Sequence, residues 1–300
     1  MRSMLAALAL VATPALALAQ TVEVQTAAGP ASVPAAPETV VALDLAAIDD
    51  LAALGVPVAG VPDVTPPAYL ADALRDIPTV GTLFEPDFEA LAVLAPDLVI
   101  AGGRSQSQVG ALSQLAPTID MTISGEDLVA ESKARLAAYG KIFGHESEAE
   151  SLIARLDAAI AGAREAAAGK GDALILLTNG GKVSAFGHGS RFGWMHSALG
   201  LPEAYPDLTA ETHGEAVSFE FIADVDPDWI FVIDRGAAIG QEGEAAAVTL
   251  DNPLVAGTKA GKAGHIVYLD PARLYLAGGG IQSMLGTIQE ITAAMSAAAG

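Results

Sequence analysis

The feature that most constrains the fold of this chain is an internal repeat. The segment 212–240, THGEAVSFEFIADVDPDWIFVIDRGAAIG, has a counterpart 131 residues earlier, and the matching positions are Phe88-Glu89 with Phe219-Glu220, Pro96-Asp97 with Pro227-Asp228, and Arg104 with Arg235. Each copy predicts a short helix, a Pro-Asp corner, a wholly apolar strand and an arginine at the end of that strand. A repeat this long is not the period of a solenoid. It predicts two similar α/β lobes, each of which brings one arginine to a shared place.

The N-terminal part predicts a hairpin followed by a βαβ unit. Polar and apolar residues alternate on both sides of the turn at 28–30, which is typical of two paired strands. The apolar run 40–43 predicts a buried strand, and Asp44 is placed to cap a helix over 45–54. We expect the next strand at 56–59, and a strand–helix–strand unit of this kind favours a parallel sheet.

A long helical stretch predicts how the lobes are joined. Residues 125–170 are helical in pattern, with one pause at 144–147, and the second part is about 23 residues, or roughly 34 Å at ~1.5 Å per residue. The predicted fold class is therefore α/β: two α/β lobes with mainly parallel sheets joined by one long helix. The predicted divisions are an N-terminal lobe at 20–143, an inter-lobe helix at 144–169, and a C-terminal lobe with a closing Ala-rich helix at 170–300.

The first nineteen residues have the pattern of a cleavable signal peptide. Arg2 precedes an apolar run over 4–18, and Ala17-Leu18-Ala19 provides small residues for cleavage. The alternative is an N-terminal transmembrane anchor, but the run is short and contains Pro14. We therefore expect export to the periplasm and removal of residues 1–19.

Composition excludes several classes of function. The chain has no cysteine, which rules out disulfides, thiolate metal sites and a lipid-modified cysteine. Removing the signal peptide takes away Arg2, so the net charge changes from −21 to −22. Nucleic acid and anionic membranes are poor partners for such an acidic surface.

Three arginines are candidates for ligand binding. Ligands bind beyond the carboxyl ends of strands in open parallel sheets, where Arg104 and Arg235 are predicted to lie, one in each lobe. Arg191 belongs to a glycine-rich stretch, 179–193, where backbone can approach a ligand closely. Three guanidinium groups facing one cleft would bind a compact, highly anionic ligand. The alternative is that each arginine pairs with a local carboxylate.

A histidine and a tyrosine are candidates for iron ligation. His213 stands where the first repeat copy has Thr82, and Tyr275 precedes a Gly-Gly-Gly loop. Imidazole nitrogen and phenolate oxygen suit Fe(III). From the residues alone, a structural role for either side chain remains open. The five histidines form no close ligand pair, so dedicated capture of a divalent metal is not expected.

Glu89 and Glu220 open the two repeat helices. A glutamate in a first helical turn is stabilised by the helix dipole, which explains either residue alone. As a symmetric pair, they would also suit basic pockets on a two-fold partner. The sequence contains no Gly-x-Ser-x-Gly, Walker or His-Glu-x-x-His motif, so enzymatic activity is not expected.

These residues resemble those of the periplasmic iron–siderophore-binding proteins that serve ABC importers, and most closely the subgroup that binds catecholate-type siderophores. The resemblance covers nearly all of the mature chain in order, through GTLFEPDFEALAVLAPDLVIAGGR, LTNGGKVSAFGHGSRFG, THGEAVSFEFIADVDPDWIFVIDRGAAIG, TLDNPLV and VYLDP…LYLAGGG. It implies the class III, helical-backbone fold of periplasmic binding proteins, and a monomer with no permanently bound cofactor.

The resemblance also implies roles for the candidate residues. Arg104, Arg191 and Arg235 match the arginines that line the cleft. His213 and Tyr275 match the two residues that complete the coordination of Fe(III) when the siderophore, which carries the iron, is tetradentate. The family docks its ABC permease, which works with an ATPase, through one glutamate per lobe, here Glu89 and Glu220. The alternatives are another cargo, such as haem, a corrinoid or free metal, and a secreted hydrolase.

Overall fold

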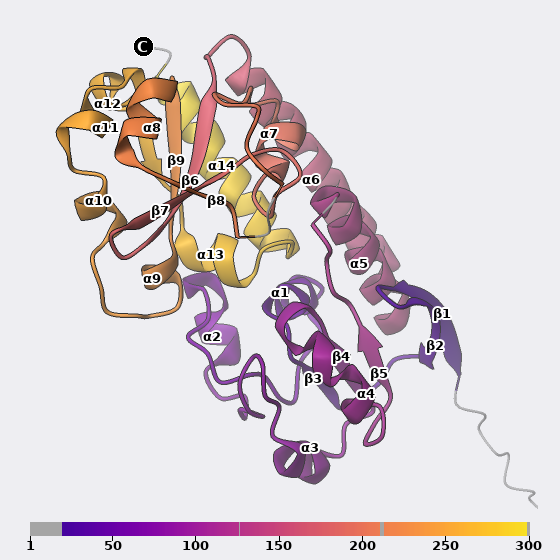
Figure 1. The fold of residues 1–300 in the computed structure, drawn as a ribbon. Coiled ribbons are helices and arrows are strands. Elements are labelled where there is room, and N and C mark those ends of the chain that lie inside the picture. Colours follow the sequence, from indigo (N-terminus) through magenta and orange to yellow (C-terminus); the bar gives the residue numbers. More distant parts are fainter. Residues whose placement is uncertain (1–19, 126, 211–212, 299–300) are drawn as a thin grey trace, which may run out of the picture.

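The computed structural model describes residues 20–125, 127–210 and 213–298. The predicted signal peptide lies outside these ranges. The chain forms two α/β lobes, one above the other in Figure 1, with long helices running along one side of both. Within the described ranges, no helix is long and apolar enough to cross a membrane.

The N-terminal lobe contains a hairpin and a parallel sheet. Strands β1 (Thr21–Thr26) and β2 (Gly29–Pro34) pair antiparallel, as predicted. The sheet has the order β3-β4-β5, with β3 at Val40–Ala42, β4 at Leu98–Ala101 and β5 at Thr118–Asp120.

The strand predicted at 56–59 is wrong. The segment meets β3 only through hydrogen bonds from Ala59 N to Val40 O (2.7 Å) and from Ala42 N to Gly60 O (3.2 Å). Pro57 has no N–H to donate, so this segment cannot extend the ladder. Val56 is buried and Val58 and Ala59 are half-buried, whereas Pro57 is exposed.

The C-terminal lobe contains a mixed five-stranded sheet. Its order is β10-β9-β6-β7-β8, with β10 at Ile266–Tyr268, β9 at Trp229–Asp234, β6 at Ala173–Asn179, β7 at Lys182–Phe186 and β8 at Glu215–Val217. Strands β10, β9 and β6 are parallel, whereas β7 and β8 are added antiparallel. Strand β7 was not predicted, because it lies within the glycine-rich stretch 179–193.

The helices connect the strands and flank the sheets. In chain order they are α1 (Leu45–Ala53), η1 (Ala68–Leu70), α2 (Ala71–Leu74), α3 (Phe88–Leu94), η2 (Gly103–Gln108), α4 (Val109–Leu112), α5 (Leu128–Phe143), α6 (Glu146–Ala167), α7 (Trp194–Leu199), α8 (Phe219–Val225), α9 (Arg235–Ala238), α10 (Ala246–Thr249), α11 (Pro253–Ala256), α12 (Lys259–Ala263), α13 (Pro271–Leu276) and α14 (Ile281–Ala297).

Two helices tie the lobes together. Helix α6, of 22 residues, packs against α5, α7 and α14, and α14 also packs against α1 of the N-terminal lobe. One continuous hydrophobic cluster includes Ile48, Leu156, Phe231 and Ile288, which come from both lobes and from both helices. The lobes therefore share a core and are not joined by a free linker. The residues at which the lobes divide stay a prediction.

Buried aspartates of α1 cap the first turn of α14. Asp50 accepts a hydrogen bond from Ile281 N (2.8 Å), and Asp49 accepts from Gln282 N (2.7 Å) and Ser283 N (2.9 Å). Helix N-termini leave unpaired N–H groups that favour a negative charge. Through these hydrogen bonds, the two side chains fasten the closing helix to the N-terminal lobe.

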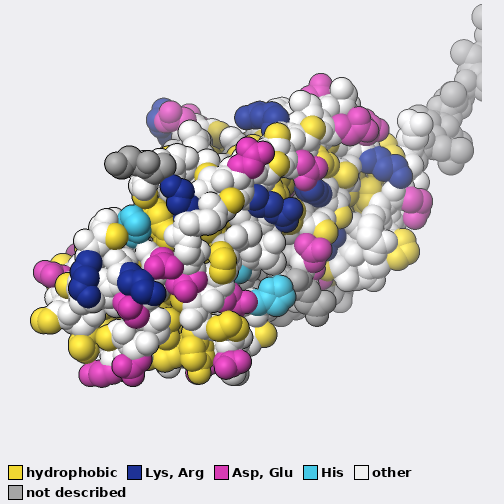
Figure 2. Space-filling model, turned by 90° about the horizontal axis from the view of Figure 1, so that it is seen from above, with side chains coloured by type: hydrophobic (Ala, Val, Ile, Leu, Met, Phe, Trp, Pro, Cys, Tyr) yellow, Lys and Arg dark blue, Asp and Glu magenta, His cyan; other side chains and the backbone are white. Residues whose placement is uncertain are grey.

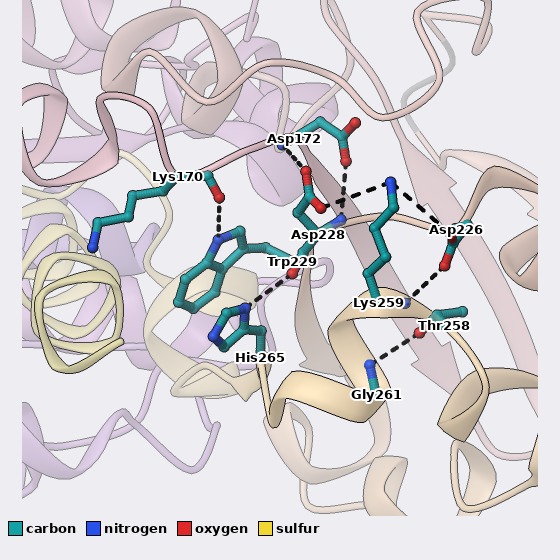
Figure 3. Close-up of polar contacts among 9 residues, drawn as sticks. All are labelled: Lys170, Asp172, Asp226, Asp228, Trp229, Thr258, Lys259, Gly261 and His265. Atoms are coloured by element: carbon teal, nitrogen blue, oxygen red, sulfur yellow. Dashed lines mark hydrogen bonds and ion pairs between the residues drawn. The ribbon is translucent and has the colours of Figure 1, made fainter. Parts of the chain in front are cut away.

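The Pro-Asp corner of each repeat copy fastens the start of a strand to its neighbour. Asp228 accepts from Asp172 N (3.0 Å) ahead of β6, and Asp172 accepts from Asp228 N (3.0 Å), as Figure 3 shows. In the first copy, Asp97 accepts from Glu38 N (3.1 Å) and Thr39 N (2.8 Å) ahead of β3. The repeated aspartates are therefore structural.

Candidate functional site

Each repeat copy places its arginine just beyond the carboxyl end of a central strand. Strands β4 and β9 are buried almost throughout, as expected for a parallel sheet covered on both faces. Arg104 lies in η2 directly after β4, and Arg235 begins α9 directly after β9. The predicted positions of these two arginines at the edges of the sheets are confirmed.

The three predicted arginines meet at one residue, Tyr275 in α13. Arg104 Nη2 donates to the Tyr275 carbonyl oxygen (2.9 Å), and Arg191 Nη2 donates to the same oxygen. Arg235 Nε donates to the Tyr275 phenol oxygen (3.0 Å), and its Nη1 donates to Asn179 Oδ1 (3.2 Å). The sequence did not point to Asn179.

The guanidinium groups also lie around the tyrosine ring. The Cζ atoms of Arg104, Arg191 and Arg235 are 5.5, 4.5 and 5.7 Å from the ring centroid. These distances are within the range of cation–π attraction. Arg104 comes from the N-terminal lobe and the other two from the C-terminal lobe, so the cluster lies between the lobes.

The cluster is held by oxygens of Tyr275 and Asn179 and not by carboxylates. Among the described residues, none of the three arginines forms an ion pair with an Asp or Glu. The alternative that each arginine pairs with a local carboxylate is therefore not what the structure shows. Burial and the neighbouring Arg104 guanidinium lower the pKa of Arg191. This site has an excess of positive charge.

The arginines change the acidity of Tyr275. Burial alone would raise the pKa of this phenol, but the hydrogen bond from Arg235 and the charges of all three guanidinium groups lower it below its ordinary value. A lowered pKa favours the phenolate, which is the form that binds ferric iron. Tyr275 is half-buried.

An acidic residue, Asp44, also faces the arginines. Its Oδ1 accepts from Ala46 N (2.9 Å) and Ala47 N (3.1 Å), which confirms its predicted role as the cap of α1. It also interacts electrostatically with Arg104 and Arg191, while burial raises the pKa of its carboxyl group. The sequence analysis did not predict that Asp44 lies near the arginines. The signal was available, because Asp44 follows β3 at the same sheet edge as Arg104.

The structure does not bring His213 together with Tyr275. His213 is exposed, and no hydrogen bond or ion pair joins it to Tyr275 in the described part of the chain. The next residue, Gly214, is so close to the Phe186 ring that an added Cβ would lie 2.7 Å from it. Phe186 in turn contacts Phe192, with ring centroids 4.8 Å apart, beside Arg191. These contacts link His213 to the cluster only indirectly, through its neighbour Gly214 and two phenylalanines, and its ligation of iron stays a prediction.

The two glutamates lie far from the arginines. Glu89 is in the first turn of α3 after the cap Asp87, and Glu220 is in the first turn of α8 after the cap Ser218. Both are exposed, and Figure 1 shows α3 and α8 at opposite ends of the molecule. Hydrogen bonds from its own amide and from Ser218 lower the pKa of Glu220. On the face in Figure 2, acidic and basic side chains are interspersed, so charge alone does not mark a docking surface there.

A hollow of about 670 Å³ lies between α5, α6 and α7. None of the three clustered arginines lines it, and its side chains Lys133 and Asp157 pair with each other. Arg164 also lines the hollow and donates to the Ala198 carbonyl oxygen (2.6 Å). With one arginine outside an ion pair instead of three, the hollow is a weaker candidate for anion binding than the arginine cluster.

The chain is similar to known proteins in both sequence and structure. Residues 40–272 match the family described as "Periplasmic binding protein". The petrobactin-binding protein YclQ of Bacillus subtilis is 38% identical over 263 residues, covering 86% of this chain and 83% of the relative. Its crystal structure superposes with a TM-score of 0.87 over 92% of this chain and 99% of that one.

Two further proteins are similar over most of their length. The ferric-anguibactin-binding protein FatB of Vibrio anguillarum is 33% identical over 262 residues, covering 85% of this chain and 81% of the relative. The crystal structure of the periplasmic catecholate-siderophore binding protein VctP from Vibrio cholerae has a TM-score of 0.84 and 31% identity, covering 93% of this chain and 100% of that one.

Proposed function

The chain belongs to the periplasmic binding protein family, and from this premise we propose that it captures an anionic ferric siderophore of the catecholate type and delivers it to an ABC permease. The observation that carries the proposal is the cluster of Arg104, Arg191 and Arg235 around Tyr275 without a carboxylate partner. The relatives named for petrobactin and anguibactin support the same class of cargo.

Binding would exchange neutral acceptors for charged ones. In the present structure, the guanidinium groups donate to the carbonyl and phenol oxygens of Tyr275. Anionic oxygens of a siderophore would accept stronger, charge-assisted hydrogen bonds from the same donors. Because the arginines come from both lobes, one ligand would bridge the lobes.

The iron arrives as part of the cargo. A tetradentate siderophore leaves two positions of octahedral ferric iron open, and we propose that the Tyr275 phenolate and the His213 imidazole fill them. The lowered pKa of Tyr275 supports the first assignment. The second requires the exposed loop of His213 to approach the cluster. No covalent chemistry and no resident cofactor are part of this function.

Delivery would take place outside the cytoplasmic membrane. We propose that residues 1–19 direct export to the periplasm and that the mature chain acts as a monomer. Glu89 and Glu220, one on each lobe, would dock the permease that works with its ATPase. Their exposure at opposite ends of the molecule supports this assignment.

A ligand panel tests the proposed cargo. The mature protein is titrated with a ferric bis-catecholate, haem, cobalamin and Fe(III) alone, and the quenching of tryptophan fluorescence is followed. We expect saturable, tight quenching only by the ferric bis-catecholate. Tighter binding of haem or cobalamin would replace the proposed cargo with another.

A further inference from the structure

One oxygen of the Asp44 carboxylate is not needed by the fold. Oδ1 accepts both backbone N–H groups that Asp44 caps in α1. Oδ2 is directed to the loop that carries Arg104, because it lies 3.3 Å from the position that a Cβ on Gly103 would occupy. No hydrogen bond from the described part of the chain reaches this oxygen.

The surroundings of Asp44 are positive but do not neutralise it directly. Arg104 and Arg191 interact with it through space, yet neither comes within ion-pair distance in the described structure. The guanidinium groups instead donate to Tyr275. The cationic cluster therefore has a separate carboxylate oxygen near it, on the loop side of Gly103.

We propose that Asp44 is a specificity-determining residue whose Oδ2 accepts a hydrogen bond from a protonated amine on the ferric siderophore. This inference rests on the proposed function. A cargo that is anionic throughout would place negative charge against Asp44, whereas an ammonium group would pair with it. Specificity is a difference of affinities, and a carboxylate that would face an anionic group without a partner disfavours the wrong ligand.

Two matched ligands test this assignment. Both are ferric complexes of two 2,3-dihydroxybenzoyl groups joined through amides by a linker of the same length. In one linker, a central secondary amine is present, and in the other a methylene replaces it. Dissociation constants are measured for the wild-type protein and for Asp44→Asn, which keeps an Oδ1 acceptor for the cap.

The control variant is Asp87→Asn. Asp87 caps α3 with the same geometry, accepting from Glu89 N (2.9 Å) and Ala90 N (3.0 Å), but it does not take part in the arginine cluster. Asp44→Ser supplies a second capping residue if Asp44→Asn lowers the melting temperature.

We expect the wild type to bind the amine-containing ligand at least about tenfold more tightly, which corresponds to about 1.4 kcal/mol. Asp44→Asn and Asp44→Ser should lose this preference, and Asp87→Asn should keep it. Equal binding of the two ligands by the wild type, or a preference that survives both Asp44 variants, would overturn the inference while leaving the proposed function intact. If neither ligand binds the wild type, the proposed function fails and this inference with it.

Discussion

At the level of single residues, Tyr275 orients three guanidinium groups without neutralising them. Its carbonyl oxygen accepts from Arg104 and Arg191, and its phenol oxygen accepts from Arg235. Neutral acceptors cost little to displace compared with a carboxylate, because no ion pair has to be broken. The site is thus preorganised for an anion and keeps its charge until one binds.

The acidity of Tyr275 gives a pH prediction. Its pKa in the folded protein lies below the ordinary value of about 10. Deprotonation of Tyr275 therefore stabilises the folded state. This contribution grows as the pH rises through the folded pKa and is complete above the ordinary pKa of about 10. It is lost again as the pH falls through the folded pKa. We expect the stability difference between wild type and Tyr275→Phe in urea unfolding to grow between pH 7 and pH 10.

The control is Tyr268→Phe, because burial and Asp251 raise the pKa of Tyr268. In an ultraviolet titration, the tyrosinate signal that disappears in Tyr275→Phe should develop at lower pH than the signal that disappears in Tyr268→Phe. The reverse order would show that the arginines do not control this phenol.

Iron ligation has a spectroscopic prediction. With a ferric bis-catecholate bound, Tyr275→Phe and His213→Ala should each shift the visible ligand-to-metal charge-transfer band, because each removes one atom bound to the iron. His145→Ala, a change at the N-cap of α6, should leave the band in place. An unaltered band in both site variants would mean that neither residue binds iron.

The sequence predicted the residues of this site better than their contacts. Arg104 and Arg235 could be found because the repeat places them after equivalent strands. That arginines from both lobes donate to the Tyr275 carbonyl oxygen could not be predicted, because every residue has a backbone carbonyl and the sequence does not show which one accepts. Asp44 was recognised as a cap only, because its second role depends on how closely Gly103 and the arginines approach it in space.

At the level of elements, each copy of the repeat supplies a central strand and the arginine that follows its carboxyl end. Its apolar runs predicted β4 and β9 correctly because these strands are buried on both faces. The same reasoning failed for 56–59, where Pro57 limits pairing, and for β7, whose pairing with β6 is set by a turn at 180–181 and not by an apolar run. Local pattern therefore predicts burial more reliably than strand pairing.

The Pro-Asp corners carry a stability prediction. Asp97→Ala and Asp228→Ala each remove the acceptor for backbone N–H groups at the start of a neighbouring strand. We expect each to lower the free energy of unfolding by about 1–3 kcal/mol. Exposed Asp76→Ala should change it by less than about 0.5 kcal/mol.

These corner variants should also retain the affinity of the wild type for a ferric bis-catecholate at a temperature where they remain folded. A loss of affinity without a loss of stability would assign the corners to the ligand site and contradict their structural role.

At the level of the whole molecule, a shared core limits how the lobes can move. Helices α6 and α14 contribute to one hydrophobic cluster with both lobes, and Asp49 and Asp50 hold the first turn of α14. Large separation of the lobes would expose this core to water. We therefore expect ligand binding to produce a small closure, with the exposed glutamates of α3 and α8 kept at a nearly fixed spacing.

Docking at that spacing is tested by charge reversal. Glu89→Arg combined with Glu220→Arg should abolish uptake of the ferric siderophore into vesicles that contain the permease, because both contacts become repulsive. Ligand affinity should remain unchanged. Glu150→Arg, an exposed reversal on α6, serves as the control and should support normal uptake. Normal uptake by the double variant would remove the glutamates from the docking surface.

The most direct test of the account is the dissociation constant of a ferric bis-catecholate for Arg235→Ala, measured beside the wild type and Arg155→Ala, an exposed change on α6. We predict that Arg235→Ala loses on the order of 2–5 kcal/mol of binding free energy, because a charge buried against the ligand is removed. Arg155→Ala should bind as the wild type does. Equal affinity of all three proteins would contradict the claim that the arginines around Tyr275 form the anion-binding site.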